Sequence, residues 1–438
     1  MSGPDVAVVV LDTLRSDAFD RQFDWLPGLR FEHAFAPSHF TTPVHASLFT
    51  GRYPTEHAVR AKARRFDYPG PALAEQLSEA GYTTRGWSAN PNVSTEYGFD
   101  RGFGEFRDAW KHDDFAAVFD WERHIHDTDP GANRYLSGLA ACLSGDYRTV
   151  PSLQRGLDFK FDRERSPPDK GARSAVDAVR RLSPDSPAFL FLNLMEVHAP
   201  YVAPSEYLDE RVESLPFELT LAEEPIDGER ERAAYDACAA YLSDVYRELF
   251  EALRERFDYV VTLSDHGHCF GEHGTVGHGY GVFPELTRVP LVVSGGPEGR
   301  SSSAVSLLDV HRTVLELAGV DPPEGARGVD LLADPEPRPC LTEYHGLYDY
   351  RIPELLVAGY SEERVERYDA ELRGLAAGTG YYGYETREGF VESGTGRPED
   401  PEALLAELVA GLDAREADGG GGEASAALSS RLEDLGYL

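Results

Sequence analysis

Short and almost continuously apolar runs recur along the chain, and they predict strands that are buried on both faces. These runs are Val6–Leu11, residues 188–195, Tyr259–Leu263 and residues 289–293. Each is bounded by polar or turn-forming residues and is rich in β-branched or large apolar side chains. This pattern is typical of parallel strands, because crossover helices cover such strands on both sides.

Between these runs, apolar residues recur at spacings of three and four, which predicts helices with one buried face. The predicted helices span residues 71–80, 234–253 and 307–318. Gly81 and Gly319 follow the first and the third, as glycine often does at a helix end. Strands that alternate with helices favour an α/β fold with a mostly parallel central sheet and helices on both faces.

Two stretches interrupt this alternation. Residues 105–170 are charged and aromatic without a clear period, and residues 205–231 form a long acidic stretch. Both could be insertions that shape a substrate pocket, and both could equally be surface excursions. We predict one large catalytic domain over residues 1–335 that includes them.

The pattern changes after about residue 335 and predicts a smaller C-terminal α+β subdomain with a tail, residues 336–438. Short strands are expected within residues 381–392 and a helix over residues 402–412. Residues 419–422 are all glycine and resemble a flexible tether. The spacing in residues 428–435 predicts a short amphipathic helix.

The charge balance is strongly acidic, with 76 aspartates and glutamates against 42 lysines and arginines and a formal net charge of −34. A surface of this sign should repel nucleic acid and anionic membranes, so neither is expected as a partner. Such acidity is typical of proteins that stay soluble in concentrated salt, where screening removes the self-repulsion, and it suggests a halophile. A specific role in binding a cationic partner is the alternative.

Four cysteines, Cys142, Cys238, Cys269 and Cys340, are scattered without a CxxC pair. This spacing argues against a disulfide scaffold and a cysteine metal site, and it suits a reducing compartment. The first residues lack a basic segment followed by an apolar stretch, and no apolar run reaches 18 residues. We therefore expect no signal peptide, no membrane span and a cytoplasmic location.

Residues with metal-binding chemistry directly follow three of the predicted strands. Asp12 follows the first strand, Glu196 and His198 follow the second, and Asp265 and His266 follow the third. In a doubly wound sheet, the carboxyl ends of parallel strands lie at one edge, where ligands bind. Two carboxylates and an imidazole that meet there suit a divalent cation.

A helix start with a reactive hydroxyl is predicted at Thr41. Pro43 marks the start of the helix, and the run of apolar and small residues ends at Gly51. Free N–H groups and the positive end of the helix dipole favour an anionic substrate group there. A hydroxyl close to a metal can ionise and attack phosphorus or sulfur. On this segment alone, the alternative that Thr41 or Thr42 only caps the helix stays open.

Six landmarks in the same order resemble the sulfatase family of the alkaline phosphatase superfamily, over most of the chain. They are the opening strand motif at residues 8–17, the nucleophile helix at 41–54 with its Thr-Gly-Arg-Tyr-Pro ending, residues 73–81 followed by Gly-Phe-Asp-Arg-Gly-Phe at 98–103, the His-x-Pro-Tyr segment within 195–201, the second metal motif at 264–274 followed by Arg-Val-Pro at 288–290, and the helix at 307–319. The resemblance implies an alkaline-phosphatase-like α/β sandwich.

The resemblance also implies roles at the centre of the site. Asp12, Asp265 and His266 would bind one divalent metal ion (Ca, Mn, Zn or Mg), and Thr41 would be the nucleophile.

Further residues of the matched motifs are implied in substrate binding. His198 and His278 would contact the anionic group of the substrate, and the alternative for His198 is a buried histidine with its hydrogen bonds satisfied. His278 stands where many relatives place a lysine, and His273 lies close enough in sequence to take its place. His45, Asn90 and Arg52 are expected to bind the substrate.

The nucleophile segment departs from the usual sulfatase motif. Typical members carry Cys-x-Pro-x-Arg, or Ser in place of Cys, and oxidise that residue to formylglycine, whereas residues 41–45 are Thr-Thr-Pro-Val-His. Threonine cannot form that aldehyde, so no formylglycine is expected. Thr-x-Pro-x-His resembles the motif of nucleotide pyrophosphatase/phosphodiesterases, which hold two zinc ions. We favour one metal here, with a second site conceivable at Glu196, His198 and His278.

The expected function is hydrolysis of a small anionic ester, a sulfate or phosphate ester that could be linked to a sugar. Two alternatives remain open: a phosphodiesterase or phosphoryl-group transferase of the same superfamily, and a catalytically inactive binding protein on the same fold. The oligomeric state is open as well.

Overall fold

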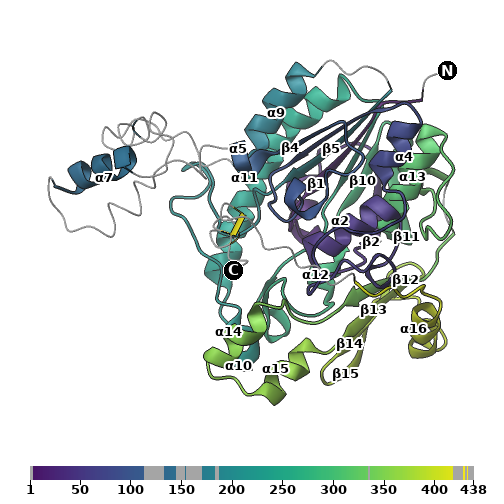
Figure 1. Ribbon diagram of the computed structural model, residues 1–438. Coiled ribbons are helices and arrows are strands. Elements are labelled where there is room, and N and C mark those ends of the chain that lie inside the picture. The colour runs from purple at the N-terminus through teal and green to yellow at the C-terminus, as the bar shows by residue number, and fades with distance from the viewer. Residues whose placement is uncertain are drawn as a thin grey trace.

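The computed structural model contains a large mixed sheet at its centre, and it describes residues 3–112, 133–144, 153, 170–182, 187–333, 336–417, 428, 429 and 432. The strands of this sheet are β1 (Val6–Leu11), β2 (Leu29–Phe35), β3 (Thr83–Ser88), β4 (Glu105–Asp108), β5 (Ala188–Leu194), β6 (Tyr259–Leu263), β9 (Arg288–Val289), β10 (Leu291–Ser294) and β11 (Gly299–Ser306). They lie in the order β11-β2-β10-β6-β1-β5-β3-β4, with β9 paired to β2 (Figure 1). The pairs that join β1, β3, β4, β5 and β6 are parallel, as is β2 with β11.

Helices cover both faces of this sheet (Figure 1). One layer contains α1 (Ser16–Gln22), α5 (Ala109–His112), α9 (Ala172–Arg181) and the long α11 (Glu229–Arg254), and the other contains α2 (Thr41–Thr50), α4 (Leu73–Glu79) and α13 (Leu308–Ala318). Strand β1 serves both layers, because its side chains alternate. Ala7, Val9 and Leu11 pack under the first layer and Val6, Val8 and Val10 under the second. A strand buried on both faces needs apolar residues at every position, which explains the continuous run.

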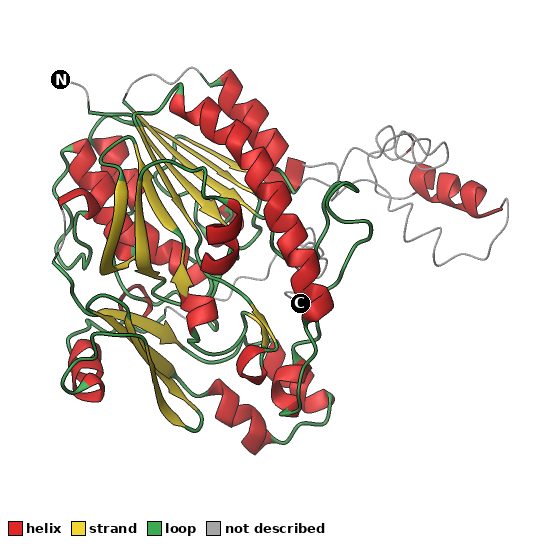
Figure 2. Ribbon diagram, turned by 180° about the vertical axis from the view of Figure 1, so that it is seen from behind, coloured by secondary structure: helices red, strands yellow, loops and turns green. Residues whose placement is uncertain are grey.

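A smaller antiparallel sheet follows in the chain and lies below the central sheet (Figure 2). It is formed by β12 (Cys340–Tyr344), β13 (Leu372–Ala377), β14 (Tyr381–Thr386) and β15 (Gly389–Ser393), with α14 (Arg351–Val357), α15 (Glu362–Asp369) and α16 (Pro401–Ala410) around it. Tyr382 stacks on Phe35 of β2 with ring centroids 4.9 Å apart, and Glu343 of β12 pairs with Ser38. The small sheet therefore packs directly beside the segment that leads into α2.

The remaining elements are short. They are α3 (Pro54–His57), α7 (Asn133–Ser144), α10 (Glu218–Ala222), α12 (Pro284–Thr287), β7 (Cys269–Phe270), β8 (Val276–Gly277) and the 3-10 turns η1 (Thr95–Tyr97), η2 (Glu272–Gly274) and η3 (Leu331–Ala333). All four cysteines are buried and free. Among the helices that the structure describes, none has the length and apolar character to cross a bilayer.

The predicted fold class is confirmed, and one predicted strand is wrong. Residues 289–293 were expected as a single parallel strand, but Pro290 separates β9 from β10, and β10 runs antiparallel to both β6 and β2. Proline has no N–H to donate to a strand partner, so the ladder breaks there. The direction follows from the connection after β6, because its helical elements are only the four-residue α12 and the short turn η2, and no crossover helix joins β6 to β10.

Other expected boundaries shift. The stretch expected as an insertion from residue 105 begins with β4, which pairs with β3 in the central sheet, and most of the rest of it lies outside the described residues. The acidic stretch 205–231 contains α10 and runs into α11, which begins at Glu229 and not near residue 234. The glycine tether at 419–422 and most of the expected helix at 428–435 also lie outside the described residues.

Candidate active site

The carboxyl ends of two neighbouring strands bring two aspartates together. Asp12 follows β1 and Asp265 comes two residues after β6, and these strands are adjacent and parallel. The Thr13 N–H donates to Asp265 Oδ1 over 3.2 Å, so the two strand ends are hydrogen-bonded to each other. The strand order therefore brings Asp12 and Asp265 together at one edge of the sheet, as the sequence predicts.

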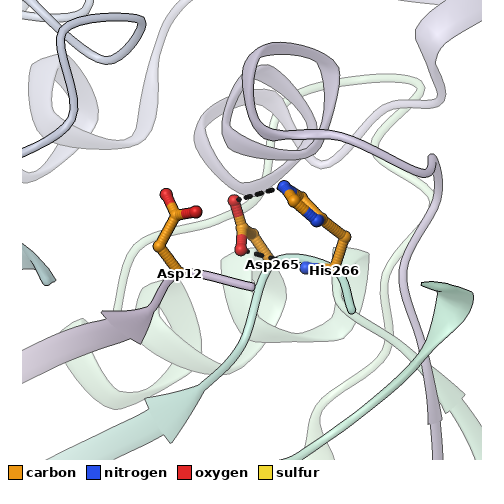
Figure 3. Close-up of side chains that lie close together, drawn as sticks. All are labelled: Asp12, Asp265 and His266. Carbon is orange, nitrogen blue, oxygen red and sulfur yellow. Dashed lines mark hydrogen bonds and ion pairs between the residues drawn. The ribbon is translucent and has the colours of Figure 1, made fainter. Parts of the chain in front are cut away.

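Asp12, Asp265 and His266 form a group whose ligand atoms all lie within 4.8 Å of one another (Figure 3). All three side chains are fully buried, and Asp12 Oδ1 and Asp265 Oδ2 have no hydrogen-bond partner. The His266 ring lies 2.9 Å from the Gly267 carbonyl through Nδ1, so Nδ1 carries the proton and donates it. Nε2 is then a lone-pair donor, 3.5 Å from Asp265 Oδ2. Unpaired carboxylate oxygens beside an imidazole lone pair fit a divalent cation.

The pKa shifts of the two aspartates also favour a cation at this position. Burial, reinforced by the negative charge of Asp265, raises the pKa of Asp12 from 3.8 to about 7. Burial also raises the pKa of Asp265 to about 7. Two buried carboxylates are stable as anions only beside positive charge, and a divalent cation supplies it.

Thr41 is the first residue of α2 and faces this group. Its Oγ1 lies 3.2 Å from His266 Nε2 and 3.5 Å from Asn90 Nδ2. Because the His266 proton is on Nδ1, the Thr41 hydroxyl donates to Nε2. The residue at the N-cap of this ten-residue helix is Phe40, whose side chain makes no capping bond, so Thr41 does not act as the cap. The first N–H groups of α2 have no acceptor within the helix, so they are available to an anion at the helix start.

Asparagines hold Asp12 from the other side. Asn90 Nδ2 donates to Asp12 Oδ2 over 2.7 Å, and Asn193 Nδ2 lies 3.3 Å from the same oxygen. Asn90 was expected at the site, whereas Asn193 was not. Its signal in the sequence is weak: it is the single polar residue of β5, whose other six residues are apolar.

His45 lies behind the site, one turn into α2. Its Nδ1 donates to the Thr41 carbonyl over 2.8 Å, and its Nε2 accepts from Asn193 over 3.1 Å. Burial lowers the pKa of His45 to about 3, so the ring is neutral and both nitrogens are engaged. This placement makes His45 a residue that orients Thr41 and Asn193.

Arg52 is not brought to the site. It follows the far end of α2, roughly 16 Å of helix axis from Thr41. Its guanidinium bonds the Glu324 carbonyl and lies 5.6 Å from the centre of the Tyr68 ring. The motif that contains Arg52 is contiguous in sequence, but the helix between its ends separates them in space.

A cluster of histidines lies beside His266. The ring of His278 is 4.5 Å from that of His266, 5.4 Å from that of His198 and 5.6 Å from that of His268, between centroids. Burial lowers the pKa of both His198 and His278 well below the ordinary value, so both rings are neutral. His268 was not expected in this cluster. His273 is not part of this cluster: its Nε2 lies 2.8 Å from Glu285 Oε2.

Glu196 does not join these histidines. Its Oε1 accepts the N–H of Ala172, the first residue of α9, over 2.8 Å. Within the described part of the chain, Asp12, Asp265 and His266 are the one group of three acidic, cysteine or histidine residues with metal-binding spacing. The geometry therefore favours one metal over the second site conceived at Glu196, His198 and His278.

Known proteins resemble this chain in sequence and in fold. The sulfatase YidJ of Escherichia coli, strain K12, itself uncharacterized, is 25% identical over 365 residues, which are 73% of this chain and 66% of YidJ. The chain thus spans about two thirds of the length of that relative. The phosphonate monoester hydrolase SpPMH from Silicibacter pomeroyi superposes with a TM-score of 0.59 at 18% identity, over 93% of this chain and 94% of that one. BT4656, solved with its substrate D-glucosamine-2-N,6-O-disulfate, superposes with a TM-score of 0.56 at 13% identity, over 100% and 98%.

A family model settles the classification. The model described as Sulfatase matches residues 21–320, which is well over half of the 438 residues. The matched region contains α2 with Thr41 and the end of β6 with Asp265 and His266. The chain belongs to the sulfatase family.

Proposed function

We propose that this chain is a metal-dependent hydrolase of sulfate or phosphate esters, phosphonate monoesters included, with Thr41 as its nucleophile. The observation that carries the proposal is the Thr41 hydroxyl, 3.2 Å from His266 Nε2 at the start of α2 and beside two buried carboxylates. SpPMH is by name a phosphonate monoester hydrolase, and the substrate named for BT4656 is a sulfated sugar. A small anionic ester linked to a sugar is the substrate class we infer.

Asp12, Asp265 and His266 would hold the cation. When bound, it would act as a Lewis acid that polarises the ester oxygens and favours ionisation of a nearby hydroxyl. With Thr41 as the nucleophile, the chemistry would not involve formylglycine.

The chain's own groups define the steps around the ester. Asn90 Nδ2, which lies between Asp12 and Thr41, and the first N–H groups of α2 would bind the non-bridging oxygens. The Thr41 hydroxyl would lose its proton to water, and its alkoxide would attack phosphorus or sulfur in line. The bond from Oγ1 to that atom forms as the bond to the alcohol oxygen breaks, and the departing alkoxide takes up a proton from water. Water would then hydrolyse the threonine ester.

His278 is the better of the two candidate histidines to stabilise the departing oxygen. His198 donates its Nδ1 proton to the Ala199 carbonyl over 2.6 Å, so the neutral ring has no proton on Nε2. The His278 ring lies 4.5 Å from the ring of His266, whose Nε2 is 3.2 Å from Thr41 Oγ1. A hydrogen bond from its N–H would stabilise the alkoxide that leaves.

The test is a panel of nitrophenyl sulfate, phosphate, phosphodiester and phosphonate substrates, with divalent metals added to metal-stripped protein in high salt. Thr41→Val keeps the side-chain shape and removes the hydroxyl. We expect turnover to fall by roughly 10³-fold or more, with metal binding retained.

Thr42→Val is the matched control, since the Thr42 hydroxyl is buried and has no hydrogen-bond partner. It should leave turnover nearly unchanged. Full activity of Thr41→Val would refute the nucleophile assignment. Metal binding without turnover of any ester would favour the inactive binding protein, and transfer to an added alcohol in preference to water would favour a transferase.

A further inference from the structure

A loop of the small sheet reaches the start of α2. Tyr348, between β12 and α14, packs edge-on against Phe40, the residue before Thr41, with ring centroids 5.0 Å apart. The Tyr348 side chain is only 7% exposed, and its hydroxyl has no hydrogen-bond partner. A buried hydroxyl without a partner is costly in a folded protein, so this one is a candidate for contact with a ligand.

Arg64 is linked to the candidate active site by a chain of hydrogen bonds. Its Nη1 donates to Asn92 Oδ1 over 3.4 Å, and the Asn92 N–H donates to Asn90 Oδ1 over 2.8 Å. Asn90 in turn contacts Thr41 Oγ1 at 3.5 Å. Two buried asparagines therefore separate the guanidinium from the nucleophile.

The surroundings of Arg64 and Tyr348 connect the two side chains. Tyr350 stacks on Tyr348 with centroids 5.3 Å apart, and the Arg64 guanidinium lies 5.7 Å from the centre of the Tyr350 ring. Burial above all raises the pKa of the Tyr348 hydroxyl well above its ordinary range; the negative charge of Asp12 adds to this rise, and the positive charge of Arg64 opposes it. The hydroxyl is thus within electrostatic reach of both the metal-site carboxylate and the arginine.

Among the residues that the structure describes, no carboxylate forms an ion pair with Arg64. Its contacts among the described residues are Asn92 and the rings of Tyr97 and Tyr350, and Asp349 acts on it only at longer range. The chain has 76 acidic and 42 basic residues, so a half-buried arginine without a carboxylate partner among the described residues is unusual in it. Near the proposed ester site, such an arginine can bind an anionic group of the ligand. Guanidinium suits the planar or tetrahedral oxygens of carboxylate, sulfate or phosphate.

We propose that Arg64 and Tyr348 bind a second anionic group on the organic half of the ester, which makes doubly anionic esters the preferred substrates. This inference rests on the proposed function. Arg64 lies after α3 and Tyr348 after β12, so the two residues come from distant segments. They would determine substrate specificity without contacting the reacting atoms.

The test compares two substrates that differ in one charge: the nitrophenyl ester that the wild-type protein turns over best, and the same ester with a carboxylate on the ring. Wild-type protein should prefer the carboxylated ester. In Arg64→Gln, kcat/KM for that ester should fall roughly tenfold or more, mainly through KM, while the plain ester changes less than about twofold. Tyr348→Phe should act in the same direction, roughly threefold, because one uncharged donor is lost.

Arg65→Gln is the control, because Arg65 is exposed and its side chain donates, among the described residues, to the Glu96 carbonyl alone, over 3.0 Å. It should leave both esters unaffected. An equal loss for both esters in Arg64→Gln would overturn the inference, because Arg64 would then act through Asn92 and Asn90 on the nucleophile. Lack of any preference in the wild-type protein would overturn it too.

A binding measurement separates this inference from the proposed function. Calorimetry with benzylphosphonate and its ring-carboxylated analogue needs no turnover. If no ester is hydrolysed but the carboxylated ligand binds more tightly and Arg64→Gln removes that difference, the hydrolase proposal fails and the second anion site stands. If plain esters are hydrolysed but the two phosphonates bind equally, the hydrolase proposal stands and the second anion site fails.

Discussion

Asp265 and Asp12 place two carboxylates in a fully buried space where two of their oxygens have no partner. Such a pair is unfavourable for a metal-free fold, because each anion has lost its hydration and faces the other. The same arrangement favours cation binding, since the ligand oxygens are already oriented. Stability and metal binding are therefore coupled through these two side chains.

The coupling predicts a pH dependence of the metal-free protein. The pKa of Asp265 is raised from 3.8 to about 7, so the folded chain holds this proton more tightly than the unfolded chain does. Folding stability without metal should then decline as the pH rises from about 4 to about 7. Asp265→Asn should weaken this decline and should lose the rise in Tm that a divalent cation gives the wild-type protein.

Thermal melting at pH 5 and pH 8, in chelator and with added metal, measures both effects. Asp321→Asn, at an exposed position after α13, is the control and should behave as the wild type. A metal-induced rise in Tm that survives in Asp265→Asn would exclude Asp265 as a ligand.

Helix α2 positions the nucleophile, and its two ends are held differently. At its start, Phe40, the residue before the helix, packs against Tyr348 in the loop after β12. At its end, Gly51 adopts φ 66°, and a Cβ there would lie 2.7 Å from His311 Nδ1 of α13. Gly319 ends α13 with nearly the same φ, 67°, but has no atom within 4 Å of such a Cβ.

These two glycines allow a matched comparison. Gly319→Ala should reduce the free energy of unfolding by about 1 kcal/mol, the cost of a left-handed backbone with a Cβ. Gly51→Ala should cost roughly 1–3 kcal/mol more, because His311 must also shift within a packed interface. Urea unfolding measures the free energy of unfolding of both variants. Equal losses would mean that His311 of α13 moves aside without cost.

The molecule as a whole carries a formal net charge of −34. Repulsion among these charges opposes the compact state, most strongly at low ionic strength. Salt screens the repulsion: the screening length is about 10 Å at 0.1 M salt and about 3 Å at 1 M. Unfolding spreads the charges apart and relieves the repulsion. The folded state should therefore gain stability as salt increases.

We expect Tm to rise steadily with added KCl at neutral pH. Sucrose at the same osmolality is the control, because it changes solvation without screening charge. A Tm that is as high in dilute buffer as in molar salt would show that charge repulsion does not limit the stability of the fold. The acidic composition would then give no reason to infer a halophile.

The outcome of the predictions differs between local and distant features. The apolar runs at Val6–Leu11 and Tyr259–Leu263 mark two strands at their true ends, because burial on both faces leaves a continuous signal. Strands β2, β3 and β4 mix polar with apolar residues and were not predicted, since strand pairing rather than composition forms them. Asn193 was missed for the same reason: its function comes from Asp12 and His45, which are distant in sequence.

The amino-acid sequence alone was enough for the α/β class and for the convergence of Asp12, Asp265 and His266, because each of these residues lies at or just after the end of a strand that its own apolar residues specify. Tertiary structure decided what depends on contacts between distant segments. It turned β10 antiparallel and brought Asn193 of β5 into contact with both Asp12 and His45. It also brought Tyr348 and Arg64 beside the site, since hydrogen bonds and ring contacts between remote segments leave no periodic trace along the chain.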